Sequence, residues 1–160
     1  MNNREKEIFE LLRQDRLDMV KTFNKPSAKG IWIGITDKYS EGAHFIYELL
    51  QNADDAGAEE VKFILSEQEL VFIHDGTIHF SVTDPRTEEE DGENGKQGHI
   101  NAITGIGFSS KGQSEEENKI GKFGVGFKAV FQYTKSPHIY DPDFRFKIED
   151  YIVPSITHAN

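Results

Sequence analysis

One segment of the sequence places two carboxylates and an amide on the same side of a predicted helix. Residues 44–58 read HFIYELLQNADDAGA, and Glu48, Asn52 and Asp55 follow one another at intervals of four and three residues. At about 3.6 residues per turn they form one stripe. A carboxylate can orient and deprotonate an attacking water, and an amide oxygen is a hard, neutral ligand for Mg²⁺. The stripe alone also fits an ordinary solvated helix face, which is the commoner arrangement.

A second group of candidate residues lies at the end of a predicted strand. The sequence VFIHDG ends in His74, Asp75 and Gly76. A carboxylate there can accept a hydrogen bond from an exocyclic amine, and a glycine lets a flat base approach the backbone. Asp-Gly is also a favoured turn dipeptide, so a plain turn is the alternative interpretation.

A third segment concentrates glycines before a predicted helix. Residues 119–131 read KIGKFGVGFKAVF and contain Gly121, Gly124 and Gly126. Glycines remove side chains where backbone amides must reach phosphate oxygens, and a helix N-terminus adds further N–H donors. The spacing matches neither the P-loop nor the Rossmann fingerprint. A flexible loop that leads into a helix is the alternative interpretation.

Taken together and in this order, the three segments resemble the motifs of the GHKL family, whose ATP-binding domain is the Bergerat fold. Residues 48–56 resemble its N box, residues 74–76 its adenine-binding motif, and residues 120–127 the lid glycine motif of the heat-shock chaperones. The phrases HFIYELLQNADDAGA and IGKFGVGFKAVF are most similar to the sacsin-like branch. The resemblance covers residues 40–153.

The resemblance implies that ATP and Mg²⁺ bind between helices, under a movable lid. Glu48 would be the general base, Asn52 the Mg²⁺ ligand, and Asp55 a support that acts through water or the nucleotide. The other expected nucleotide contacts lie at the base, on the approach to the lid and in the lid itself: Asp75, Gly76, Lys111, Gly121, Lys122, Phe123, Gly124, Val125, Gly126 and Phe127.

The second motif departs from the family pattern, which reads Asp-x-Gly-x-Gly. Here His74 stands at the position of the Asp, Asp75 adjoins Gly76, and Ile78 replaces the second glycine. Either Asp75 takes the adenine amine, or His74 and a water do so, and Asp75 is the favoured choice. The departure affects base affinity and selectivity more than the fold.

The elements that must position these residues form an α+β chain. Hydrophobic periodicity predicts helices at 4–23, 41–55, 99–104 and 127–133, and strands at 59–65, 70–75, 138–140 and 144–153. The resemblance implies a two-layer α/β sandwich whose mixed, mainly antiparallel sheet is covered by helices on one face. We expect one domain over residues 1–160, with an N-terminal helical extension at 1–30 and a nucleotide-binding core at 40–153.

Composition argues against several classes of partner and site. The chain has 160 residues, no Cys and a net charge of -10. Duplex binding depends on Lys and Arg displacing counterions, so nucleic acid is not an expected partner. The lack of Cys excludes disulfides and thiolate metal sites. We find neither the apolar core of a signal peptide nor an apolar run of about 20 residues, so we expect a cytoplasmic location and no membrane contact.

Several functions are compatible with these features. The leading hypothesis is a slow ATPase in which ATP binding closes the lid and drives homodimerisation or a rearrangement of further domains of the same protein, chaperone-like by analogy. The family's later strands and the catalytic Lys or Arg of a following domain are not found, so we expect a piece of a larger protein. The alternatives are a stand-alone hydrolase, a histidine-kinase catalytic domain, a machine of the mismatch-repair or gyrase kind, and a degenerate nucleotide fold that acts only as a protein-interaction module.

Overall fold

The computed structural model describes residues 1–39, 45–87, 97–106 and 126–157. Helices and strands follow one another along the whole described chain. They are α1 (Asn3–Phe23), α2 (Lys29–Tyr39), α3 (Phe45–Asp55), β1 (Val61–Leu65), β2 (Leu70–His74), the 3₁₀-helix η1 (Pro85–Thr87), α5 (His99–Ile103), the 3₁₀-helix η2 (Lys128–Gln132), β3 (His138–Tyr140), β4 (Arg145–Glu149) and β5 (Val153–Ile156). The predicted α+β class is confirmed.

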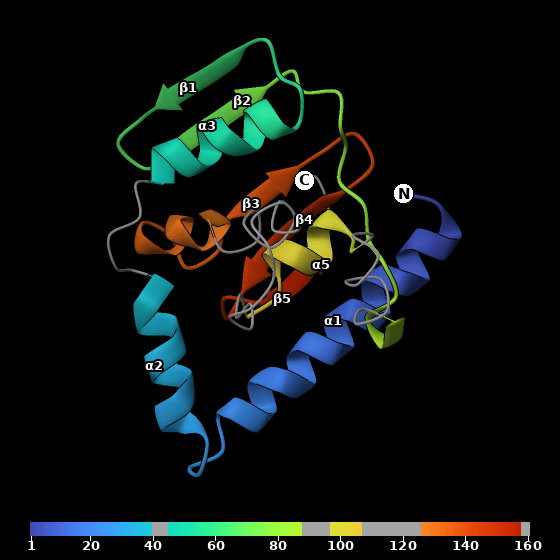
Figure 1. Ribbon diagram of the computed structural model, residues 1–160, viewed down its shortest axis with the longest axis vertical. Helices are drawn as coiled ribbons and strands as arrows, with labels where there is room; N and C mark the ends of the chain where they lie inside the picture. Colours follow the sequence, from blue (N-terminus) through green and yellow to red (C-terminus); the bar gives the residue numbers. More distant parts are fainter. Residues whose placement is uncertain (40–44, 88–96, 107–125, 158–160) are drawn as a thin grey trace, which may run out of the picture.

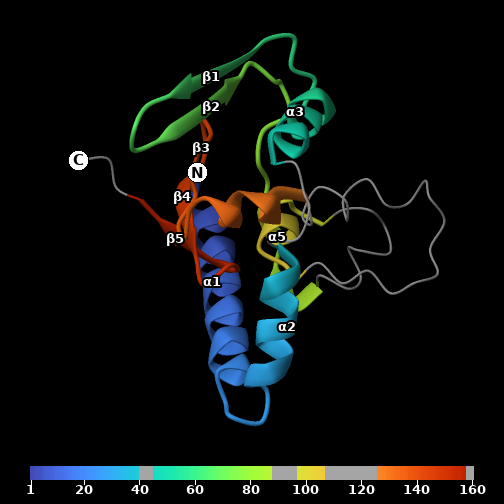
Figure 2. The same ribbon diagram turned by 90° about the vertical axis from the view of Figure 1, so that its left-hand side faces the viewer.

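Strand pairing among the described residues is antiparallel throughout and forms two separate sheets (Figure 1). β1 and β2 form a hairpin in which Phe63 lies opposite Phe72. β3, β4 and β5 form the second sheet in that order. Figure 2 shows the hairpin and α3 at one end of the molecule and the paired helices α1 and α2 at the other, with the three-stranded sheet between them. The strands therefore occupy two sheets, where the sequence suggests one.

The helix predicted at 4–23 is confirmed as α1. It begins with a capping box, in which the Asn2 side chain accepts the N–H of Glu5 (2.9 Å) and the Glu5 carboxylate accepts the N–H of Asn2 (2.6 Å). The described part of the helix predicted at 41–55 is α3. The helix predicted at 127–133 is the shorter 3₁₀-helix η2.

The prediction of a single strand over 144–153 is wrong. The chain turns between β4 and β5, where Asp150 and Tyr151 adopt φ values of 49° and 68°. β4 and β5 are neighbouring antiparallel strands of one sheet, with Ile148 opposite Pro154. The helix α2 is not among the predicted elements.

The main core lies between α1, α5 and the three-stranded sheet. Phe9 stacks on Phe144 with a centroid distance of 6.5 Å and meets Phe146 edge to face at 5.7 Å. α1 is therefore an integral part of the core. The buried members of the main core are Phe9, Leu12, Ile100, Ile103, Phe127, Ile139, Phe144, Phe146 and Ile148.

Lys128 is buried beside a second, aromatic cluster. Its side chain is 1% exposed, its Nζ donates a hydrogen bond to the carbonyl of Tyr151, and the rings of Tyr39 and Phe131 each lie 5.6 Å from Nζ. Burial lowers the pKa of Lys128 well below its usual value, and the nearby charge of Arg16 lowers it further. The side-chain nitrogen thus joins η2 to the β4–β5 turn, where burial disfavours its positive charge.

We expect Lys128→Met to remove a pH dependence of stability. Between the lowered pKa and 10.5 the unfolded chain holds a proton that the folded chain releases, so the stability of the wild type rises with pH in this window. The slope is at most about 1.4 kcal/mol per pH unit. Urea unfolding at a series of pH values below 10.5 measures this slope. As the pH rises, the free energy of unfolding of the wild type should increase relative to that of Lys128→Met.

The exposed Lys135 provides the control for this experiment. Lys135→Met should give a pH–stability curve that runs parallel to the wild-type curve. Parallel curves for wild type and Lys128→Met would contradict the prediction.

Candidate functional site

Two of the three predicted motifs meet at the start of α3. Glu48 lies in the first turn of this helix, and Gly126 lies just before η2. A β-carbon built on Gly126 would lie 1.8 Å from Oε2 of Glu48 and 2.6 Å from its Cδ. The carboxylate of Glu48 therefore lies directly against the backbone of Gly126, and a side chain at position 126 would have to displace it.

An aromatic contact fixes this end of α3 in place. The rings of Phe45 and Tyr133 are 4.5 Å apart, which holds the first residue of α3 against the segment that follows η2. Asn52 lies one turn beyond Glu48, and both are partly buried, whereas Asp55 is exposed. One helix face thus presents Glu48 and Asn52 about 6 Å apart along its axis.

The other end of α3 meets the third motif. The helix ends in a Schellman motif, in which Ala58 N–H donates to the Ala53 carbonyl and Gly57 N–H to the Asp54 carbonyl, both at 2.9 Å. Gly57 has a φ of 73°, the left-handed conformation that a glycine adopts readily at the end of a helix. A β-carbon built on Gly76 would lie 2.9 Å from Cβ of Ala56. α3 therefore spans the distance between Gly126 at one end and Gly76 at the other.

His74 and Asp75 have different partners, although they are adjacent. Nδ1 of His74 accepts the N–H of Gly76 at 3.1 Å. Oδ1 of Asp75 accepts the N–H groups of Glu59 and Glu60, each at 2.9 Å. These two hydrogen bonds, that from Glu60 foremost, lower the pKa of Asp75. The Asp75 carboxylate thereby closes the loop between α3 and β1.

The remaining predicted site residues divide into two groups. Phe127 is 8% exposed and packs in the main core. The approach and lid residues Lys111, Gly121, Lys122, Phe123, Gly124 and Val125 lie outside the described residues. Sequence reasoning did not single out Lys128 as buried, although one signal was present, because it is the single charge in the apolar run FKAVF.

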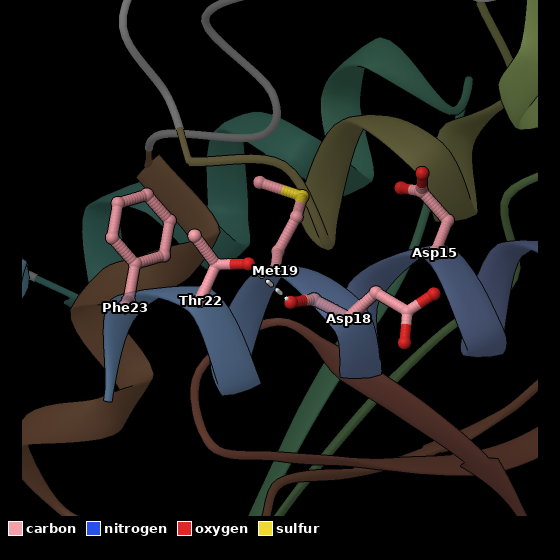
Figure 3. Close-up of a pocket in the computed structure, with 5 residues that line it drawn as sticks. All are labelled: Asp15, Asp18, Met19, Thr22 and Phe23. Carbon is pink, nitrogen blue, oxygen red and sulfur yellow. Dashed lines mark hydrogen bonds between the residues drawn. The ribbon is translucent and has the colours of Figure 1, made fainter. Parts of the chain in front are cut away.

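Surface hollows do not compete with α3 as the candidate site. A hollow of about 280 Å³ lies along α1 and is lined by Asp15, Asp18, Met19, Thr22 and Phe23 (Figure 3). These side chains all come from one helix, where the Thr22 hydroxyl donates to the Asp18 carbonyl at 3.0 Å. A larger hollow is lined by the β1–β2 turn alone. Over the described ranges, no three His, Cys, Asp or Glu side chains gather to hold a metal ion.

Comparison with known proteins identifies the family. A family model described as "Sacsin domain" matches residues 32–158, which include α3, the end of β2 and Gly126. The chain belongs to the sacsin-domain family. The resemblance to the sacsin-like branch is thereby confirmed. None of the described helices is long and apolar enough to cross a membrane.

Two curated relatives show how the sacsin domain of this chain compares in extent. The chain is 33% identical over 129 residues to Protein NO VEIN of Arabidopsis thaliana. The match covers 74% of this chain and 4% of that protein. It is 30% identical over 118 residues to human Sacsin. This match covers 68% of this chain and 2% of that protein. The chain thus spans a few per cent of the length of either relative. No solved structure matches the chain.

Proposed function

We propose that this sacsin-domain chain has a GHKL-type site that binds ATP with Mg²⁺ and hydrolyses it slowly. The observation that carries the proposal is the contact between Glu48 and Gly126. It brings a carboxylate suited to general-base catalysis against the last glycine of a motif suited to phosphate binding. Two segments that are distant in the sequence thus meet where the proposed chemistry needs both.

Each residue of the α3 face has a role in this proposal. Glu48 orients the attacking water and accepts its proton. The Asn52 side-chain oxygen, one turn away, would hold Mg²⁺, and its hard amide donor suits that ion. Mg²⁺, when bound, would neutralise negative charge on the phosphates. Gly126 lets the last residue of the glycine motif and the Glu48 carboxylate lie together, because a β-carbon there would strike Glu48.

The wider role of the chain is part of the same proposal. Lys111 and the lid glycines Gly121 and Gly124 would contact the phosphates. ATP binding would then drive homodimerisation or a rearrangement of further domains, with a chaperone-like outcome. The much greater length of the two relatives is consistent with a module that works within a larger protein.

We expect Asn52→Ala to lose the Mg²⁺-dependent part of ATP affinity. Calorimetric titration of the wild type should show tighter binding of ATP with Mg²⁺ than with a chelator, and the variant should abolish that difference. Loss of one charge-assisted contact corresponds to about tenfold in affinity.

Gln68→Ala is the matched control, because Gln68 is an exposed amide in the β1–β2 turn and not on α3. It should bind ATP with Mg²⁺ as the wild type does. A folded wild type that binds no ATP, or an Asn52→Ala variant that keeps the full Mg²⁺ effect, would refute the proposal.

A second candidate function is a protein-interaction module without turnover. The observation that favours it is the exposure of the β1–β2 hairpin, where every residue of β1 is exposed. Its large apolar side chains reach exposures of 79% for Leu65 and 47% for Ile73. Exposed apolar surface of this kind marks contact sites between proteins. A well-folded chain that binds no nucleotide in the titration above would favour this candidate.

A further inference from the structure

The strand β1 carries apolar side chains that are exposed on both of its faces. Alternation along the strand places Val61, Phe63 and Leu65 on one face and Ile64 on the other. These four side chains are between 37% and 79% exposed. An antiparallel sheet commonly packs one face on a core, and an isolated two-stranded hairpin is only marginally stable. The β1–β2 hairpin therefore has both surface and stability to gain from a partner.

The backbone of β1 also has an edge that no described strand occupies. Ser66 N–H donates to the Glu69 carbonyl at 2.9 Å, so this pair is bonded across the hairpin. Asp75 N–H donates to the Glu60 carbonyl at 3.3 Å at the other end. Between these pairs, every second residue of an antiparallel strand turns its N–H and C=O outward. On β1 the outward-turned residues are Val61, Phe63 and Leu65. Among the described strands only β2 pairs with β1.

β1 is the outer strand of the hairpin. Both views show it farther from the three-stranded sheet than β2 is (Figure 1, Figure 2). An additional strand can therefore reach the free edge of β1 without displacing any element that the structure describes. The free edge of β2, in contrast, faces the body of the molecule.

The charges around the free edge of β1 are nearly all negative. Glu59 and Glu60 precede the strand, Glu67 follows it, and all three are exposed. Residues 45–78, which contain α3 and the hairpin, hold eight Asp and Glu and one Lys. A partner for this edge is therefore favoured if it carries positive charge on both sides of an apolar centre.

The same charges disfavour a second copy of the chain as the partner. If two β1 strands paired antiparallel about Phe63, Glu59 of each copy would lie opposite Glu67 of the other. Like charges directly opposite one another destabilise a strand pair. The net charge of -10 adds to this repulsion.

We propose that the free edge of β1 binds an extended segment of another protein, with apolar residues flanked by Lys or Arg, as an added antiparallel strand. The outward N–H and C=O groups of Val61, Phe63 and Leu65 hold the main chain of the segment. Its apolar side chains cover those of β1, and its cations lie beside the carboxylates at both ends of the strand. The inference is independent of the proposed nucleotide site, and it gives the interaction-module candidate a surface and a class of partner.

Titration of the whole chain with the peptide Lys-Lys-Val-Thr-Phe-Thr-Val-Lys-Lys, in the absence of nucleotide, tests the proposal. Binding should shift the backbone amide NMR signals of Val61, Phe63 and Leu65 and slow the exchange of these amides with deuterium. The same peptide with Glu in place of every Lys should bind about tenfold more weakly or worse. Added salt should weaken the binding of the Lys peptide.

Two proline variants distinguish the edges of the hairpin. Phe63→Pro removes an outward N–H from β1, and Phe72→Pro removes the outward N–H opposite it on β2. Proline is tolerated on an edge strand where the N–H faces solvent, so both variants keep the pairing of β1 with β2. Both also lose the same contact between the rings of Phe63 and Phe72, whose centroids are 4.7 Å apart. Phe63→Pro should bind the Lys peptide about tenfold more weakly than Phe72→Pro.

A charge variant tests the proposal without any change in β1 itself. Glu67→Lys should lower the affinity for the Lys peptide and raise the affinity for the Glu peptide, by about threefold each. Glu7→Lys is the matched control, because Glu7 is exposed on α1 and the charge change is the same. It should leave both affinities as they are in the wild type.

Four results would overturn the proposal. They are no binding of the Lys peptide to the folded wild type, equal binding of the Lys and Glu peptides, equal loss in the two proline variants while their hairpin amide signals are retained, and dimerisation of the chain that protects the β1 amides without peptide. The last would make a second copy the occupant of the edge. None of these results bears on ATP binding, so the nucleotide site is tested separately by its own titration.

Discussion

Glu48→Gln is expected to lower the rate of ATP hydrolysis by roughly 10²–10⁴-fold, the usual contribution of a general base. Gln has nearly the same shape as Glu, so it can lie against Gly126 as the carboxylate does, but it cannot accept a proton from water. Mg²⁺-ATP affinity should therefore change little. Because turnover by this chain is expected to be slow, phosphate release in a single turnover at saturating ATP is the appropriate measurement, with calorimetry for the affinity.

Asp54→Asn is the matched control for this prediction. Asp54 is exposed on α3 and lies away from the stripe of Glu48, so the same loss of one negative charge should leave hydrolysis unchanged. An equal loss in both variants would show that the effect is one of net charge and not of a base.

The other side of the contact offers an independent check. In Gly126→Ala the new methyl group would displace the Glu48 carboxylate, whose nearest atom would lie 1.8 Å away. The end of a flexible side chain can swing aside, so we expect the fold to persist while hydrolysis falls. Because both changes act on one contact, the double variant should be no slower than Glu48→Gln alone. Wild-type turnover in Gly126→Ala would contradict the role given to this contact.

The second large effect is expected in the core. Phe9→Ala should lower the free energy of unfolding by about 3–5 kcal/mol, the typical cost of deleting a buried phenyl ring. The side chain is 1% exposed and meets both Phe144 and Phe146, so little solvent can enter to offset the loss. Chemical denaturation followed by circular dichroism measures the change.

Leu11→Ala is the control for Phe9→Ala. Leu11 lies on the same helix and is 37% exposed, so its truncation should cost much less. Equal losses would mean that α1 contributes by its helicity and not by the face that Phe9 buries. The result also tests whether the matched region 32–158 depends on a segment that precedes it, because Phe9 lies outside this region and Phe144 and Phe146 lie within it.

Local signals were sufficient to predict most of the fold. The periodic apolar residues of α1 and the short Val-, Ile- and Phe-rich runs of the β1–β2 hairpin carry their structure in their own sequence. α2 lacks such a signal, because it contains glycines and β-branched residues and begins within the stretch Lys-Pro-Ser-Ala-Lys-Gly, which is typical of a helix break. Its stability comes from distant partners, since Trp32 stacks on Phe23 at 5.0 Å and meets Tyr151 at 6.1 Å.

The error over 144–153 has a similar cause. Alternating apolar residues predict a continuous strand, and although Asp150 tolerates positive φ, Tyr151 is not typical of a turn with positive φ. Rings from elsewhere hold Tyr151 in this conformation: Tyr39 at 5.7 Å and Phe131 at 5.0 Å. The turn is thus specified by tertiary contacts that a local pattern does not contain.

For the candidate site, the sequence suggested residues but not the partners that these residues have in the folded chain. The stripe on α3 follows from helical spacing alone, but spacing gives no distance between Glu48 and Gly126, which only the folded chain brings into contact. Likewise, the pattern His-Asp-Gly does not indicate that His74 accepts the N–H of Gly76 beside the end of α3, whereas Asp75 accepts hydrogen bonds from the loop before β1. Resemblance to a family supplied the connection between motifs, and the structure supplies its geometry.

The position of α3 between Gly126 and Gly76 sets a length as well as a chemistry. From Glu48 to Ala56 a helix rises about 12 Å, and because its backbone is hydrogen-bonded throughout, that separation does not adjust to the ligand. A molecule engages both ends only if its own two recognised groups are that far apart. In the proposed site, the helix would therefore set the minimum length of a ligand that contacts both ends, independently of the chemistry of the side chains.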